Sequence, residues 1–95
     1  MPETWFNVRW PDDSRSRCYS PSSTTTEFFE AGAAYPVPEF MRRSRDALTH
    51  AGERVRAKYG YACSASAEQL IAIERRAMAF SGDAAARVLV EGFER

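Results

Sequence analysis

The chain has 95 residues, 44% of them hydrophobic and 13% aromatic, which is enough for the core of a single small domain over residues 1–95. Its thirteen basic and thirteen acidic residues cancel, so the composition gives no electrostatic support for a nucleic-acid or anionic-membrane partner. Because no apolar run approaches the roughly 20 residues of a membrane span, and the N-terminus does not resemble a signal peptide, we expect a soluble cytoplasmic protein.

A β-hairpin is predicted at the beginning of the chain. Residues 5–10 alternate, with Phe6, Val8 and Trp10 on one face, which is the pattern of a half-buried strand. Residues 11–14 supply turn chemistry, and residues 15–20 return as a second strand that Pro21 ends.

The conformation of residues 22–35 stays open, because the threonine-rich part suits a loop or a short extended segment. Phe28 or Phe29 is expected to anchor this segment to the core, and the alternative is an exposed aromatic contact for a partner. Residues 35–38 are expected to be extended, since a residue before proline is pushed out of the α region.

A long amphipathic helix is predicted from Pro38 to Gly60. Pro38 suits the first turn of a helix, and Gly60 stands where a left-handed C-cap residue belongs. Gly52 costs about 1 kcal/mol relative to alanine inside a helix, and it is a candidate for a close crossing with a second helix. The predicted core stripe has spacings of three and four: Met41, Ser44, Leu48, Ala51, Val55 and Tyr59.

A second helix and a last strand complete the chain. Ser66 and Gln69 have the spacing of a capping box, with Ser64 as a rival cap, and the helix is predicted to run to about Ser81. Its expected buried residues are Leu70, Ile73, Ala77 and Phe80. Residues 87–91 are predicted to form a strand that can continue through residue 93, and their apolar centre suggests a strand covered on both faces or inside the sheet.

The predicted fold class is α+β, with the order β-β-α-α-β. The simplest packing is a three-stranded, antiparallel-type sheet with both helices packed on one face. The last strand is placed beside the first, because this leaves the polar second strand at an edge. The other face of the sheet, including Trp5, is then partly exposed, which makes a homodimer plausible.

The two cysteines are the first candidate site. Cys63 is predicted to precede a helix N-terminus, where the helix dipole stabilises a thiolate, and Cys18 lies on the inner side of the hairpin and could approach it. A reactive pair would make a thiol-redox sensor. The alternative is a purely structural role, in which the two free thiols serve only as small buried hydrophobic groups.

The arginine-rich side of the first helix is the second candidate, because arginine makes forked contacts with phosphates and carboxylates. Its alternative is a solvated helix face. The chain has one histidine and lacks nucleophile-elbow, phosphate-loop, dinucleotide and CxxC motifs, so we assign no catalytic residue, metal or cofactor. The candidate binding residues surround the end of the first helix: Cys18, Tyr19, Arg54, Arg56, Tyr59, Tyr61, Cys63 and Ser64.

Three stretches taken together resemble a known family: RWPD at residues 9–12 with CYSPS at 18–22, the helix segment 40–60 ending VRAKYG, and the following Cys63-Ser64. The chain is similar, over nearly its whole length, to small bacterial nitrogen starvation response proteins. The resemblance implies a gene cluster that also encodes a nitrilase, an acetyltransferase-like protein, a radical-SAM protein and a flavoprotein. It implies a physiological setting and carries over no catalytic residue.

Two functions are compatible with these observations. The first is a non-enzymatic accessory or regulatory protein that binds a protein of the same gene cluster, or itself, through an exposed sheet face. The second is a small-molecule or thiol-redox sensor built on Cys18, Cys63, Tyr59 and the nearby arginines. An enzyme acting alone has the least support, because the sequence shows no recognisable set of residues for acid–base catalysis.

Overall fold

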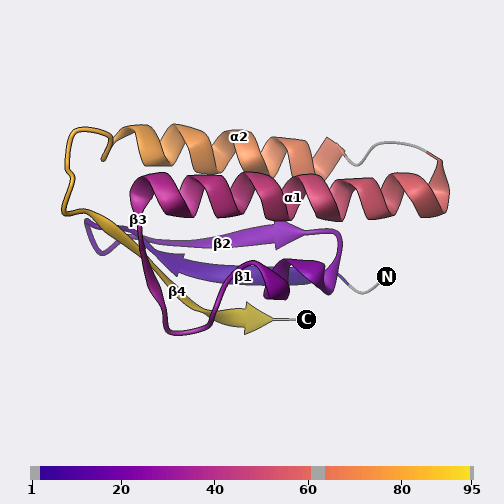
Figure 1. Cartoon of the computed structure of the whole chain (residues 1–95), viewed down its shortest axis with the longest axis horizontal. Coiled ribbons are helices and arrows are strands. Elements are labelled where there is room, and N and C mark those ends of the chain that lie inside the picture. The colour runs from indigo at the N-terminus through magenta and orange to yellow at the C-terminus, as the bar shows by residue number, and fades with distance from the viewer. Residues whose placement is uncertain (1–2, 61–63, 95) are drawn as a thin grey trace.

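Two α-helices lie side by side on one face of a four-stranded sheet (Figure 1). The computed structural model describes residues 3–60 and 64–94. The elements in chain order are β1 (Thr4–Arg9), β2 (Arg15–Ser20), the 3-10 helix η1 (Ser23–Glu27), β3 (Ala34–Pro36), α1 (Val37–Tyr59), α2 (Ser64–Met78) and β4 (Arg87–Glu94). The predicted α+β class is confirmed.

The strand order is β2-β1-β4-β3, and every neighbouring pair is antiparallel. The last strand therefore lies beside the first and the polar second strand lies at an edge, as predicted. The prediction of three strands was wrong, because β3 adds a fourth beside β4. Extended geometry before Pro36 was expected, but three residues are too few to show the alternation that identifies a strand.

The hairpin turn is a three-residue loop closed by backbone hydrogen bonds. Trp10 N donates to Ser14 O at 2.7 Å, and Asp13 N donates to Trp10 O at 2.9 Å. Asp13 has φ of 70°, the left-handed conformation that such loops require at this position and that aspartate tolerates. The turn chemistry of residues 11–14 thus sets the register of β1 on β2, with Phe6 opposite Cys18.

The segment between β2 and β3 is ordered by a small buried polar cluster, defined by Ser20, Ser22 and Thr25. The Ser20 hydroxyl donates to Ser22 O at 2.8 Å and also bonds Thr25 Oγ1, while Ser22 Oγ caps the 3-10 helix at Thr24 N. Phe29 follows and is 4% exposed, so the expectation that one phenylalanine anchors this segment is confirmed.

Helix α1 begins and ends as the sequence predicts. Pro36 and Pro38 flank its start, and Gly60 caps its end with φ of 78° and a bond from Gly60 N to Arg56 O at 2.8 Å. Its buried stripe fits between the sheet and α2 and consists of Val37, Phe40, Ser44, Ala47, Leu48, Ala51 and Val55. The last turns of α1 extend beyond the sheet (Figure 1), and residues 56–60 are exposed.

Helix α2 begins at Ser64, so the prediction of Ser66 as its cap was wrong. Ser66 lies inside the first turn and is only 6% exposed, because its side chain is buried where α2 crosses α1. A Cβ built on Gly52 would lie 3.2 Å from Ser66 Oγ, which confirms the close crossing expected at Gly52. The helix ends at Met78, and tighter backbone bonds continue to Ser81.

The core lies between the sheet and the helices. Trp10 packs edge-on against Phe40 at 5.5 Å between ring centroids, and Phe6 stacks on Phe29 at 5.3 Å. From α2, Ile73 and Ala77 are buried as predicted, whereas Leu70 and Phe80 are only partly buried against the cluster. None of the described helices has a stretch long and apolar enough to cross a membrane.

Candidate interaction surface

Both helices pack on the same face of the sheet, so neither covers the opposite face (Figure 1). We call this opposite side the outer face. Alternation along β1 and β2 places half of their side chains there, partly or fully exposed: Trp5, Asn7, Arg9, Arg15, Arg17 and Tyr19.

An aromatic–arginine cluster occupies one end of the outer face. Trp5 and Tyr19 are cross-strand partners, and their rings meet edge to face at 5.6 Å. The guanidinium of Arg17 lies 4.4 Å from the centre of the Trp5 ring, a cation–π geometry. The three side chains are therefore held against one another before any partner arrives.

Carboxylates of β4 hold the arginines of the outer face. The register of β1 on β4 shifts between Asn7 and Val8, so Glu91 has no partner residue on β1. This bulge places the Glu91 carboxylate 3.1 Å from Arg9 and 3.4 Å from Arg15. Glu91 and Arg15, together with Asn7 and Arg17 among others, line a shallow polar depression of about 500 Å³.

Glu94, at the end of β4, is the second carboxylate that contacts the outer face. Its carboxylate accepts from Asn7 Nδ2 at 2.8 Å and from Arg17 Nε at 3.0 Å. The hydrogen bond from Asn7, followed by the hydrogen bond and charge of Arg17, lowers the pKa of Glu94 below its ordinary value. At neutral pH the carboxylate is therefore ionised and holds Arg17 over Trp5.

Helix α2 meets β2 and the hairpin turn through two polar side chains. Tyr19 N donates to Gln69 Oε1 at 2.9 Å. Arg76 Nη2 donates to Asp12 Oδ2 at 2.6 Å and also to the Ser14 hydroxyl. Hydrogen bonds from Ser14, and then from Arg76, lower the pKa of Asp12 from 3.8 to about 2.

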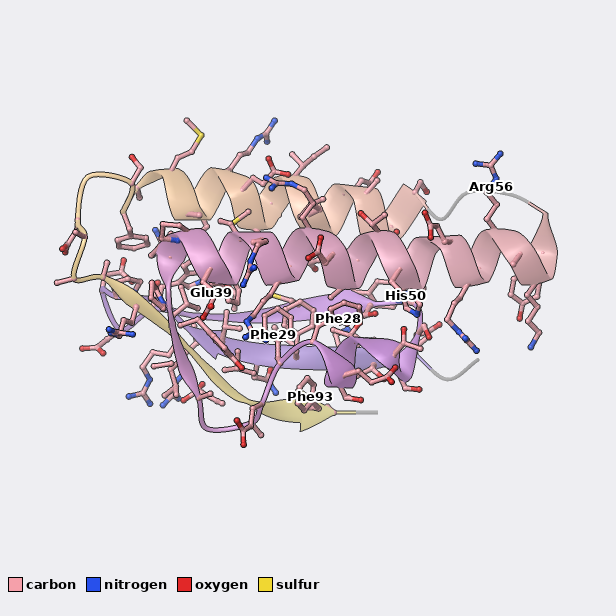
Figure 2. All side chains as sticks on the ribbon, in the orientation of Figure 1. Phe28, Phe29, Glu39, His50, Arg56 and Phe93 are labelled. Carbon is pink, nitrogen blue, oxygen red and sulfur yellow. The ribbon has the colours of Figure 1, made fainter. Side chains whose placement is uncertain are left out.

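The residues proposed from the sequence fall into separate places. Tyr61 and Cys63 lie outside the described residues. Arg54, Arg56 and Ser64 are exposed at the end of α1 and the start of α2, and Arg56 lies far from the sheet (Figure 2). Tyr59 is 52% exposed with Lys58 Nζ 5.5 Å from its ring centre.

Cys18 and Tyr19 point to opposite faces of β2. Cys18 is 0% exposed in the core, and burial raises the pKa of its thiol from 9.0 to about 12. A thiol with these properties is neither accessible nor ionised at neutral pH. The structure thus separates Cys18 from the exposed groups at the end of α1, and the proposed approach of Cys63 to Cys18 stays a prediction.

Two grooves lie along the helix pair. One, of about 260 Å³, follows the Gly52–Ser66 crossing and is lined by Arg56 among others. The second, of about 540 Å³, lies at the other end of the pair between Met41, Met78 and Phe80. Within the residues that the structure describes, no three histidine, cysteine or acidic side chains cluster to hold a metal ion.

The sequence predicts that an exposed sheet face that includes Trp5 binds a partner, but it does not identify the Trp5–Arg17–Tyr19 cluster as a site. Alternation alone places Trp5 and Asn7 on one face, and Arg17 and Tyr19 on the matching face of the next strand. The pairing of Trp5 with Tyr19 depends on the register of β1 on β2, and the contacts of Glu91 depend on the bulge between β1 and β4. The alternation pattern alone predicts neither.

Comparison with known proteins places this chain in a family. Residues 5–93 match the family model described as nitrogen starvation-induced protein NitG, while no curated protein and no solved structure gives a significant match. The matched range extends from the first residues of the hairpin through nearly all of β4. The chain therefore belongs to the NitG family of nitrogen starvation-induced proteins.

Proposed function

We propose that this NitG-family chain is a non-catalytic accessory protein that acts by binding another protein through the outer face of its sheet. The observation that carries this proposal is the Trp5–Arg17–Tyr19 cluster, which lies on a sheet face that neither helix covers. Tryptophan, tyrosine and arginine are the residues that dominate binding energy at protein interfaces.

The cluster also has the preorganisation that favours binding. Glu94 holds Arg17, and Arg17 lies over Trp5, so less side-chain entropy remains to be lost when a partner docks. The side chain of Arg17 is 54% exposed, so a partner can reach it, unlike the side chains of a polar cluster buried inside the domain. These contacts support a surface prepared for a partner.

The resemblance to nitrogen starvation response proteins suggests candidates for that partner. The proteins encoded in such gene clusters include a nitrilase, an acetyltransferase-like protein, a radical-SAM protein and a flavoprotein. We propose that the chain binds one of these enzymes during nitrogen limitation, with the nitrilase as the first candidate.

Co-expression with each of the four enzymes, followed by size-exclusion chromatography, tests this function. We expect one stable complex, and we expect Trp5→Ala to abolish it. Tyr59→Ala is the matched control, because Tyr59 is an exposed aromatic residue at the end of α1, where the sequence had suggested a site. Circular dichroism verifies that both variants fold.

The two variants separate the alternatives. A complex that survives Trp5→Ala but is lost with Tyr59→Ala would assign the interaction to the end of α1 and contradict the outer-face proposal. Absence of a complex with all four enzymes would contradict the accessory function itself.

A further inference from the structure

The two edges of the sheet differ in their capacity to accept another strand. The β3 edge has three residues and ends in Pro36, and short length and proline are both features that protect an edge from pairing. The β2 edge has six residues, Arg15–Ser20, without proline. In the described part of the chain, no strand pairs with the free side of β2.

The backbone groups that face this free side can be identified from two independent contacts. Trp10 N donates to Ser14 O, so these two residues form a hydrogen-bonded pair. In an antiparallel ladder such pairs recur at every second position, and Val8 with Ser16 is therefore the next hydrogen-bonded pair between β1 and β2. Consequently, the N–H and C=O groups of Arg15, Arg17 and Tyr19 point away from β1. The bond from Tyr19 N to the side chain of Gln69 shows the same direction.

Helix α2 packs against β2 and makes two polar contacts along this side of the hairpin. Gln69 accepts the Tyr19 N–H, and Arg76 bonds Ser14 in the hairpin turn. Between these two points lie Arg15 and Arg17, whose side chains are 65% and 54% exposed. The backbone N–H and C=O groups of these two residues face the side of β2 on which no described strand pairs.

The charge along the edge determines which strand fits. Arg9, Arg15 and Arg17 share the two carboxylates of Glu91 and Glu94, so the outer face near β2 keeps an excess of positive charge. A second copy fits poorly, because two-fold antiparallel registers centred on residues 16 or 17 set arginine opposite arginine. Like charges directly opposite one another destabilise strand pairing.

We propose that an extended acidic segment of a partner protein binds here, adding as a fifth strand beside Arg15–Tyr19. Its carboxylates occupy alternate positions, because Arg15 and Arg17 are two residues apart and point to the same face. Backbone hydrogen bonds supply affinity and the arginines select charge, as in strand-addition complexes. This inference rests on the proposed accessory function and specifies the chemistry of its partner.

A short peptide in which threonine and glutamate alternate is the probe, and its threonine–lysine counterpart is the control. We expect the acidic peptide to bind at least about tenfold more tightly, with an affinity that falls as salt screens the charges. Amide hydrogen exchange should show new protection at Arg15 and Arg17. Arg17→Thr should weaken binding while keeping a good strand former, and Arg45→Thr on exposed α1 should not.

Gln69→Ala provides a second variant that leaves the sheet intact. It frees the Tyr19 N–H for the incoming strand, so we expect tighter peptide binding and protection that extends to Tyr19. Equal binding of the lysine peptide, or binding without protection of Arg15 and Arg17, would overturn the inference. Concentration-dependent protection of these amides without peptide, together with a dimer by light scattering, would overturn it in favour of a second copy.

The outcomes also separate this inference from the function on which it rests. A complex with a cluster enzyme that requires Trp5 but leaves the β2 amides unprotected would refute strand addition and keep the accessory role. Peptide protection at β2 without any enzyme complex would keep the edge site and refute the proposed partners.

Discussion

At the scale of single residues, the contacts of each arginine show whether it stabilises the fold or lies available on the surface. Arg76 joins α2 to the hairpin turn through Asp12. Arg43 donates to Phe28 O at 2.9 Å and lies 4.6 Å from the centre of the Tyr35 ring, so it fastens the segment before α1. Arg17 instead lies on the outer face, where it is half-exposed above Trp5.

The Asp12 contact predicts a specific pH dependence. The folded pKa of about 2 lies below the ordinary value of 3.8, so the stabilisation is fully present above pH 3.8 and is lost as the pH falls towards 2. The difference in unfolding free energy between wild type and Asp12→Asn should shrink across this window in denaturant titrations.

The control is an NMR titration that measures the pKa of the Asp12 carboxyl in wild type and in variants of its two partners. The pKa should rise most in Ser14→Ala, because the Ser14 side-chain bond is the largest cause of the lowered pKa, and less in Arg76→Gln. An Asp12 midpoint that neither variant moves would show that these contacts are not formed in solution.

The burial of Cys18 predicts an inert thiol. In Cys63→Ser, Cys18 is the sole remaining cysteine, and it should not react with a thiol reagent at mildly alkaline pH, because it is 0% exposed with a pKa of about 12. It should react fully after denaturation. Rapid labelling of the folded variant would restore Cys18 as a candidate for redox sensing.

At the scale of elements, the helix crossing and the η1 segment illustrate what sequence patterns can and cannot predict. The 3.6-residue periodicity and the C-cap glycine predicted the bounds of α1 closely, and Gly52 correctly indicated the crossing. The predicted core stripe was wrong at Tyr59, which is 52% exposed. The state of residues 23–27 was not predictable, because η1 depends on hydrogen bonds among Ser20, Ser22 and Thr25. Those bonds form only when the folded domain excludes water from them.

A double-mutant cycle tests the crossing of α1 and α2. Alanine at position 52 gains about 1 kcal/mol of helix propensity, but its Cβ would lie 3.2 Å from Ser66 Oγ, closer than ordinary contact. We therefore expect Gly52→Ala to stabilise the Ser66→Ala protein by about 0.5–1 kcal/mol more than it stabilises wild type. An additive cycle in thermal or denaturant unfolding would contradict this contact.

The two neighbouring phenylalanines test how the η1 segment is anchored. Figure 2 shows Phe28 and Phe29 between this segment and α1, and of the two only Phe29 is buried, with 4% of its surface exposed. Phe29→Ala should reduce the unfolding free energy by about 3–5 kcal/mol. Phe28→Ala should cost about 1–2 kcal/mol, since it packs partly exposed against His50. Equal losses in denaturant titrations would refute the assignment of Phe29 as the anchor.

At the scale of the whole molecule, the layered arrangement explains why the candidate binding residues expected at the end of α1 differ from the proposed cluster on the exposed sheet face. Sequence reasoning directed attention to the end of α1, where basic and aromatic residues are dense. The fold extends that end beyond the sheet and buries Cys18 away from it. The outer face gathers Trp5, Arg17 and Tyr19 only because strand pairing aligns residues from two strands.

The most direct test of the account is an NMR map of the isotope-labelled chain bound to its enzyme partner. We predict that the Trp5 indole N–H and the Arg17 Nε–H show the largest changes on binding, while the Tyr59 ring signals stay at their free positions. Changes confined to Tyr59 and the end of α1, with Trp5 unaffected, would contradict the outer face as the binding surface.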